Sequence, residues 1–436
     1  MNRDSDLQID LRQMIIAIET AVSLVGMNDV NHGKRVGYIA GQIGSTLGLS
    51  DADIQFLFEL GLLHDCGVST EQVHSNLINN FAWEDADVHC EIGFHLLKDF
   101  VPLSKFAVPI KYHHTPWSRL KESDVTLFDQ RMANIIFLSD RIDTLACGHY
   151  ESDILLLREK IVEEISNYSG SFFKPEFVEA FVSSEKAEAF WISLEDRHVT
   201  RYVWDMGKQK SQELLSLADI KQLCRIMSYI VDQKSSFTAQ HSLRVADLAK
   251  FMAKVYGLSE SQCDKVEIAG LLHDIGKLHM PDDILEKPGP LEPIERAIMN
   301  QHSYETYEIL RHIEGLDEVA KWAAFHHEGI NGTGYPFHPK KQELSTEARI
   351  IAVADVFQAL VQDRPYREGM DIPQVIDVLD AFARKGKLDN TLVELVHANI
   401  GECYAVARGE DAEGNKLKNT ELLSGVIVGS YTSPAN

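Results

Sequence analysis

The second half of the chain carries histidine and aspartate residues in an arrangement that suits metal binding. His273 and Asp274 are adjacent in the segment GLLHDIGK, and His326 and His327 are adjacent in HHEGINGTGYP. Imidazole and carboxylate ligands without a thiolate suit iron, manganese, cobalt or zinc. Adjacent side chains on a helix diverge by about 100°, so His273 can point to one metal ion while the carboxylate of Asp274 reaches two. The candidate ligands of this two-metal site are His241, His273, Asp274, His302, His326, His327 and Asp355.

The first half of the chain repeats these residue types in the same order. The sequence GLLHD occurs at residues 61–65 and again at residues 270–274, a separation of 209 residues. Such a repeat indicates the internal duplication of a domain. One buried histidine is more often a core residue than a ligand, but seven residues recurring in order favour ligands. The matching set, a second candidate metal site, is His32, His64, Asp65, His89, His113, His114 and Asp140.

Both halves show the periodicity of amphipathic helices around these residues. The second half places His241, Val245 and Leu248 on one helical face, and the first half repeats this spacing. The pattern predicts an all-α fold of two tandem helical bundles. A polar segment containing Gly207 separates two apolar stretches and indicates the boundary. The expected domains are residues 1–206 and 212–408, followed by a C-terminal tail at 409–436.

Composition limits the classes of protein to which the chain can belong. Its 44% hydrophobic and 25% charged residues are typical of a soluble protein. The formal net charge of −24 argues against a nucleic acid polymer as partner, because phosphate backbones bind clustered cations. A small phosphorylated ligand could still be held by metal ions and a few local cations. We expect no membrane span or signal peptide, and six cysteines without a CxxC pair indicate a cytoplasmic protein with reduced thiols.

Four motifs in the second half resemble the HD-GYP branch of the HD-domain metal phosphohydrolases. They are HDIGK (273–277), MPDDILEKPGPL (280–291), HHEGINGTGYP (326–336) and ADVFQALVQDRPYR (354–367). The resemblance covers roughly residues 215–375. It implies an all-helical bundle in which Asp274 bridges two divalent metal ions, non-haem iron or manganese. One ion would be completed by His241, His273 and Asp355, and the other by His302, His326 and His327.

The same resemblance implies hydrolysis of a bacterial cyclic dinucleotide, cyclic di-GMP or 3′3′-cyclic GMP-AMP, to a linear 5′-phosphorylated dinucleotide. His273 and Asp274 would be catalytic. Lys277, also catalytic, would hold a non-bridging phosphate oxygen as a point charge. Phe237 stands where trinuclear family members place a glutamate, so two metal ions are expected rather than three. Further substrate contacts are expected from Gly334, Tyr335, Arg364 and Arg367.

The first half lacks the residues expected to bind a dinucleotide. Val68 replaces Lys277, HHTPWSRL replaces the GYP loop, and DRIDTLACGHY has no counterpart of RPYR. Three roles therefore stay open for this degenerate HD-like domain. It could be a structural or regulatory domain whose histidines fill its core. It could be a metal-bound domain that contacts and regulates its sibling, or a separate phosphohydrolase, such as a 5′-nucleotidase acting on the linear product.

Two alternatives also stay open for the chain as a whole. One is an HD phosphohydrolase acting on mononucleotides, with the GYP motif incidental. The other is a non-catalytic sensor that binds a cyclic dinucleotide without cleaving it. Taken singly, Lys277 could be a solvated helix-end lysine and the arginines could pair with surface acids. The complete ligand set beside these motifs favours the phosphodiesterase.

Overall fold

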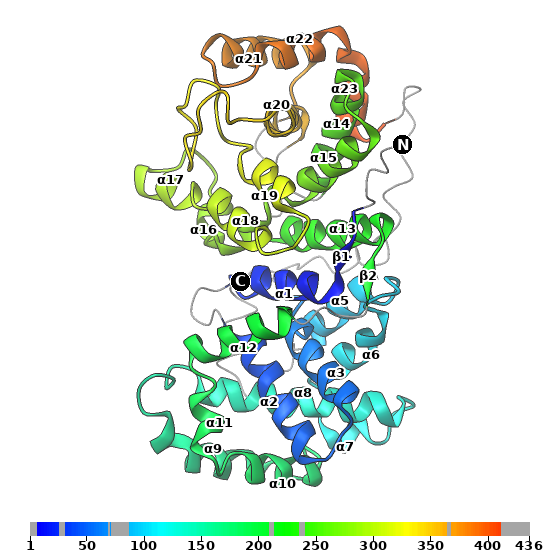
Figure 1. Ribbon diagram of the computed structural model, residues 1–436, viewed down its shortest axis with the longest axis vertical. Coiled ribbons are helices and arrows are strands. Elements are labelled where there is room, and N and C mark those ends of the chain that lie inside the picture. The colour runs from blue at the N-terminus through cyan, green and yellow to red at the C-terminus, as the bar shows by residue number, and fades with distance from the viewer. Residues whose placement is uncertain are drawn as a thin grey trace, which may run out of the picture. The chain divides into compact units, whose positions relative to one another are not determined.

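The computed structural model describes residues 7–25, 31–68, 70, 87–208, 213–234, 240–363 and 368–410, and these residues are almost entirely helical (Figure 1). Two short strands, β1 (Ile9–Asp10) and β2 (Leu214–Leu215), pair with each other. The all-α prediction is therefore confirmed. No helix in the described part of the chain is both long and apolar enough to cross a membrane.

The chain divides into two compact units, which we call the N-terminal unit and the C-terminal unit. Their described residues are 10–208 with Glu213, and 7–9 with 214–410, respectively. The predicted tail lies outside the described residues from residue 411 onward.

The N-terminal unit is built around three packed helices. α2 (His32–Thr46) packs against α3 (Asp51–Leu63) and against α8 (Leu127–Ala146). Side-chain caps begin two of these helices, because the hydroxyls of Ser50 and Thr126 accept backbone N–H groups two or three positions into α3 and α8. The other helices are α1 (Leu11–Val22), α5 (Asp87–Leu97), α6 (Ser104–Tyr112), α7 (Trp117–Leu120), α9 (Ile154–Asn167), α10 (Pro175–Ser184), α11 (Glu188–Ile192) and α12 (Asp196–Lys208).

The C-terminal unit repeats this central arrangement. α14 (His241–Tyr256) packs against α15 (Glu260–Leu272) and against α20 (Thr346–Val361). Ser259 and Ser345 cap α15 and α20 in the same way. The remaining helices are α13 (Leu217–Gln233), the 3₁₀ helix η2 (Ile275–His279), α16 (Asp282–Leu285), α17 (Pro293–Met299), α18 (His302–Leu310), α19 (Asp317–Ala324), α21 (Ile372–Arg384), α22 (Asn390–Ala398) and α23 (Ile400–Arg408).

A close backbone approach recurs in both units just after the HD pair. A β-carbon at Gly67 would lie 2.1 Å from the carbonyl oxygen of His89, and one at Gly276 would lie 2.0 Å from that of His302. Only glycine fits at either position, because real β-carbons do not approach other heavy atoms so closely. The glycine after HD therefore brings the next histidine-bearing helix, α5 or α18, against the HD pair.

Candidate metal centre

Helix ends position most of the candidate ligands of the C-terminal unit. His241 is the first residue of α14, His273 is the C-cap of α15, and His302 is the first residue of α18. The pair His326 and His327 follows the end of α19, whereas Asp355 lies in the middle of the long, buried α20. The other candidate in this unit, Asp274, is the N-cap of η2.

The structure brings all seven C-terminal candidates together around Asp274. Its Oδ2 atom lies 3.2 Å from His273 Nε2 and 3.8 Å from His241 Nε2, whereas Oδ1 lies 3.6 Å from His302 Nε2 and 3.7 Å from His326 Nε2. The two oxygens of one carboxylate therefore face two different histidine groups. In each group the ligand atoms lie within 4.8 Å of one another, and the groups are His241, His273, Asp355 and His302, His326, His327.

Backbone carbonyl groups set the orientation of three of these imidazoles. In each case Nδ1 contacts the carbonyl oxygen of the residue three positions earlier. The distances are 2.8 Å for His273 to Gly270, 2.6 Å for His302 to Met299 and 2.6 Å for His326 to Ala323. Since a carbonyl oxygen only accepts, Nδ1 must carry a proton, and in the neutral form of each ring the lone pair of Nε2 points into the site.

Several of these inward-facing atoms have no protein partner. The Nε2 atom of His273 and the Oδ1 atom of Asp274 are buried without a hydrogen bond in the described structure. The Nε2 atoms of His302 and His326 face each other at 3.3 Å. Unsatisfied buried polar atoms are costly, and besides His326 the His302 Nε2 atom has the Ser303 hydroxyl at 3.3 Å. A bound cation would satisfy all of them, so the residues present fit a metal centre.

Burial keeps most of these histidines in the neutral form that a metal ion requires. It lowers the pKa of His302 to about 3 and that of His327 to about 4. His273 differs, because burial opposes its charge but the adjacent Asp274 carboxylate raises its pKa to about 8. Burial also disfavours the charged form of Asp274, yet the neighbouring charges of His273 and Lys277 hold its pKa well below the usual range.

Lys277 is the lysine or arginine that contacts the carboxylate of Asp274 in the described structure. Its Nζ lies 2.5 Å from Asp274 Oδ2, and its side chain is 23% exposed. Burial disfavours its charge, but Asp274 raises the pKa of Lys277 above its usual value. The lysine of the HDIGK motif therefore stays protonated at the edge of the site.

The GYP loop packs directly against the ligands. The Tyr335 ring lies 4.8 Å from that of His327, with 37° between the planes. A β-carbon at Gly334 would lie 2.4 Å from the carbonyl oxygen of His327, so this loop can approach only with glycine there. The buried carboxylate of Glu328 holds the following segment by accepting the backbone N–H groups of Phe337 and His338 at 2.6 and 3.1 Å.

Some sequence predictions fall outside the described residues. Arg364 and Arg367 of the RPYR motif, and Phe237 at the third-metal position, belong to segments that the structure does not describe. Sequence reasoning also missed Gln362, whose Oε1 lies 3.3 Å from His241 Nδ1. Gln362 lies inside the motif ADVFQALVQDRPYR (354–367), but nothing in that motif indicates a contact with His241; the structure places this glutamine at the C-cap of α20.

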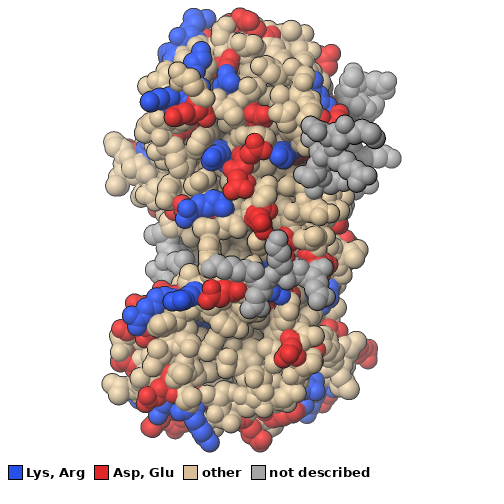
Figure 2. Space-filling view, in the orientation of Figure 1, with Lys and Arg blue, Asp and Glu red and all other residues tan. Residues whose placement is uncertain are grey.

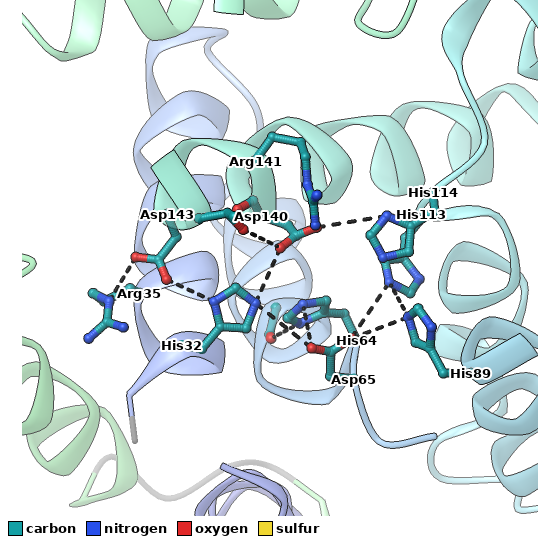
Figure 3. Close-up of polar contacts among 12 residues, drawn as sticks. His32, Arg35, His64, Asp65, His89, His113, His114, Asp140, Arg141 and Asp143 are labelled. Atoms are coloured by element: carbon teal, nitrogen blue, oxygen red, sulfur yellow. Dashed lines mark hydrogen bonds and ion pairs between the residues drawn. The ribbon is translucent and has the colours of Figure 1, made fainter. Parts of the chain in front are cut away.

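The N-terminal unit arranges its candidate ligands in the same way (Figure 3). Asp65 Oδ2 lies 3.5 Å from His64 Nε2 and 3.8 Å from His32 Nε2, whereas Oδ1 lies 3.4 Å from His89 Nε2 and 3.9 Å from His113 Nε2. Within the described part of this unit, the Nε2 atom of His64 and the Oδ1 atom of Asp65 are again buried without a hydrogen bond. The two remaining candidates, His114 and Asp140, lie close together in space, with His114 Nδ1 3.8 Å from Asp140 Oδ2.

Figure 3 shows Asp143 and Arg35 on the side of His32 that faces away from Asp65, a pair of contacts that was not predicted from the sequence. His32 Nδ1 lies 2.8 Å from Asp143 Oδ2, and the other oxygen of Asp143 accepts from Arg35 Nε at 2.7 Å and from the Tyr150 hydroxyl at 2.6 Å. Such a carboxylate orients a ligand histidine and increases its basicity. A sequence signal existed, because Asp143 lies three residues after Asp140 and hence on the same face of α8.

The two units place the cation that contacts a candidate ligand aspartate at different positions. Val68, at the position of Lys277, is buried and apolar. Instead, Arg141 donates from Nη2 at 2.7 Å and from Nε at 3.1 Å to Asp140 Oδ2. The N-terminal unit thus keeps a positive charge on a candidate ligand but contributes it from α8.

On the face shown in Figure 2, lysine and arginine residues are interspersed with acidic residues rather than gathered into a continuous basic surface. At the candidate metal sites themselves, Lys277 contacts Asp274 in one unit and Arg141 contacts Asp140 in the other.

Comparisons with known proteins agree with this geometry. The HD domain family matches residues 225–392, within the C-terminal unit. The 3′3′-cGAMP-specific phosphodiesterase 1 of Vibrio cholerae is 35% identical over 407 residues, which cover 92% of this chain and 94% of that protein. The cyclic di-GMP phosphodiesterase of Thermotoga maritima is 31% identical over 273 residues, 60% of this chain and 67% of that protein.

The crystal structure of the cyclic GMP-AMP specific phosphodiesterase V-cGAP3 from V. cholerae shares the fold. It aligns with a TM-score of 0.63 at 23% identity, covering 90% of this chain and 98% of that one. The assignment of the N-terminal unit as a degenerate HD domain stays a prediction, because the family match does not reach it. The relative at 35% identity spans nearly all of both proteins, and the chain accordingly belongs to the HD-GYP family of HD-domain phosphodiesterases.

Proposed function

We propose that this protein is a metal-dependent phosphodiesterase that hydrolyses a cyclic dinucleotide, cyclic di-GMP or 3′3′-cyclic GMP-AMP, to a linear 5′-phosphorylated dinucleotide. The observation that carries the proposal is the placement of Asp274, whose two oxygens face two separate histidine groups. The similarity to phosphodiesterases over most of the chain supports it. Both Vibrio cholerae relatives that match at least 85% of the chain are named as 3′3′-cGAMP-specific, which favours that substrate.

The proposed roles of the ligands follow from the two groups. Asp274 bridges two divalent metal ions, iron or manganese. Bound there, such ions supply an activated water and neutralise charge on the phosphate undergoing in-line displacement. Phe237 in place of a glutamate supports two ions rather than three. The first ion is held by His241, His273 and Asp355, and the second by His302, His326 and His327.

Lys277 and the GYP loop are proposed to hold the substrate. Lys277 Nζ is already beside Asp274, so it can donate to a non-bridging oxygen of a phosphate bound at the centre. Tyr335 packs on His327 next to this position, and burial raises the pKa of its phenol, which keeps it a hydrogen-bond donor. Gly334 lets the loop approach, while Arg364 and Arg367 provide planar forks for the phosphates.

The test is product chromatography on metal-analysed protein given cyclic di-GMP, 3′3′-cyclic GMP-AMP and a panel of mononucleotides. We expect a linear 5′-phosphorylated dinucleotide, and no turnover by the variant His273→Ala/Asp274→Ala. Phosphate release from mononucleotides with untouched cyclic dinucleotides would establish the mononucleotide phosphohydrolase instead. Tight binding of a cyclic dinucleotide by fully metal-loaded protein, without turnover, would establish the sensor.

The N-terminal unit has a separate place in the proposal. We propose that it contacts or regulates the C-terminal unit, because it lacks the lysine and the GYP loop but keeps the ligand set.

Removal of the 5′-phosphate from the linear product stays a prediction. It is tested by supplying the linear dinucleotide to His64→Ala/Asp65→Ala protein, and phosphate release equal to that of the wild type would exclude the N-terminal unit as its catalyst.

A further inference from the structure

The two ligand sets differ in the residue that follows one of the candidate ligands. This ligand is His89 in the N-terminal unit and His302 in the C-terminal unit. Cys90 follows His89 on α5, whereas Ser303 follows His302 on α18. The Cys90 Sγ atom lies 3.7 Å from His89 Nε2, and the Ser303 Oγ atom lies 3.3 Å from His302 Nε2. Both side chains are buried. The chain therefore places a sulfur atom in one unit where it places a hydroxyl oxygen in the other.

Ligand atoms of His89, Cys90, His113 and His114 all lie within 4.8 Å of one another, a group that could hold a metal ion, and Cys90 Sγ contacts His113 at Nδ1, 3.5 Å away. Asp65 Oδ1 lies 3.4 Å from His89 Nε2 and 3.9 Å from His113 Nε2, and these two Nε2 atoms are 3.3 Å apart. Ligands bonded at about 2.0–2.3 Å in tetrahedral geometry are roughly 3.3–3.8 Å from one another. The 3.7 Å separation between Cys90 Sγ and His89 Nε2 lies within this range.

An independent observation points to a cation at this place. Among the described residues, the Oδ1 atom of Asp65, which faces His89 at 3.4 Å, is buried without a hydrogen bond, and so is the Nε2 atom of His64, which lies 3.5 Å from the other oxygen of Asp65. His64 Nδ1 donates to the Gly61 carbonyl oxygen at 2.8 Å, so the Nε2 lone pair faces inward. In Figure 3, His64 and Asp65 lie between His32 on one side and His89 with His113 on the other.

We propose that the N-terminal unit holds a metal ion of its own, with the Cys90 thiolate as a ligand beside Asp65, His89 and His113. Binding forms a sulfur–metal bond and releases the thiol proton to solvent. A thiolate favours zinc over iron or manganese, whereas a ligand set of imidazole and carboxylate alone does not. One chain would thus carry two metal sites of different preference, distinguished by Cys90 and Ser303. This inference does not depend on the proposed phosphodiesterase activity.

The experiment uses the full-length chain, stripped of metal under reducing conditions and reloaded with cobalt(II) as the probe. Cobalt bound to a thiolate shows a near-ultraviolet sulfur-to-metal charge-transfer band, which imidazole and carboxylate ligands do not produce. We expect this band in the wild type, its retention in His273→Ala protein, and its displacement by added zinc. We expect Cys90→Ser to abolish it. A wild type that binds cobalt without the band would overturn the proposal.

Cys66→Ser is the matched control, because Cys66 is also buried and is adjacent to Asp65. It should keep the band; a band lost in this variant but kept in Cys90→Ser would refute the assignment of Cys90. Ser303→Cys provides a second measurement that does not need Cys90→Ser to fold. It should add a second charge-transfer contribution from the C-terminal unit, and no gain would show that this position does not reach a metal ion.

Discussion

The N-terminal and C-terminal units present similar ligand sets but surround them with different side chains. In the C-terminal unit, Lys277 contacts the central candidate ligand Asp274. In the N-terminal unit that position is the buried Val68, and Arg141 contacts Asp140 instead. The carboxylate of Asp143 contacts His32 in the N-terminal unit. The corresponding residue in the C-terminal unit is Gln358.

The comparison separates what helix packing determines from what single side chains determine. Both ligand sets rest on helix ends, on backbone carbonyl groups that orient the imidazoles, and on the glycine after HD. These features recur because each is required to pack the helices. Of the proposed substrate residues that the structure describes, Lys277 lies on the 3₁₀ helix η2 and Gly334 and Tyr335 lie on a loop, where a substitution disturbs helix packing less. A duplicated unit can therefore lose substrate contacts and keep its ligand geometry.

The largest effect is expected from replacing Asp274, and the matching replacement of Asp65 provides the comparison. Asp274→Asn should reduce cyclic-dinucleotide hydrolysis by at least ~1000-fold, about 4 kcal/mol, because the amide cannot bridge two cations. Asp65→Asn should change the rate by less than about fivefold, because the N-terminal unit lacks the substrate residues. Product chromatography with elemental analysis measures both. An equal loss in Asp65→Asn would break the comparison and assign catalysis to both units.

The next effect concerns the shared packing. Gly276→Ala and Gly67→Ala would each press a β-carbon against a carbonyl oxygen, at 2.0 and 2.1 Å respectively. Each should lower the free energy of unfolding by about 3 kcal/mol, and denaturant unfolding measures it.

Gly41→Ala is the matched control for these two variants. The nearest heavy atom to a β-carbon there is 3.8 Å away, and the residue is inside α2. Alanine is the better helix former, so this variant should be neutral or slightly more stable. If Gly67→Ala and Gly276→Ala behave like Gly41→Ala, the close approach is not required in either unit.

A smaller effect is expected at the motif that only the C-terminal half contains. Arg364→Ala or Arg367→Ala should raise KM by about 10–100-fold, roughly 1.4–2.8 kcal/mol, through loss of charge-assisted contacts to phosphate. Metal content should stay unchanged. Steady-state kinetics together with metal analysis distinguishes this outcome from loss of the metal centre, which would assign these arginines to the fold.

The smallest expected effect exchanges a residue between the units. Lys277→Val gives the C-terminal unit the residue that the N-terminal unit has at position 68. It should lower kcat/KM by about tenfold, near 1.4 kcal/mol, because one contact to phosphate is lost. Metal binding should be kept or strengthened, since the competing charge beside Asp274 is removed. An unchanged kcat/KM would show that Lys277 acts only as a partner of Asp274.

The amino-acid sequence by itself determined the all-α class, the internal repeat and the family. Each of these depends on short, local patterns: helical periodicity, the repeated GLLHD segment, and the motifs HDIGK and HHEGINGTGYP. The same patterns named the fourteen candidate ligands in the two halves, because histidine and aspartate in those motifs are recognisable without coordinates.

Only the tertiary structure decided which atoms of these residues face one another. The two oxygens of Asp274 point to histidines up to 52 residues distant in the chain, and no sequence pattern specifies that orientation. The contacts of Asp143 with His32 and of Cys90 with His113 likewise join separate helices. Such contacts depend on how helices cross and where they end, which is decided by the packing of the whole unit rather than by neighbouring residues.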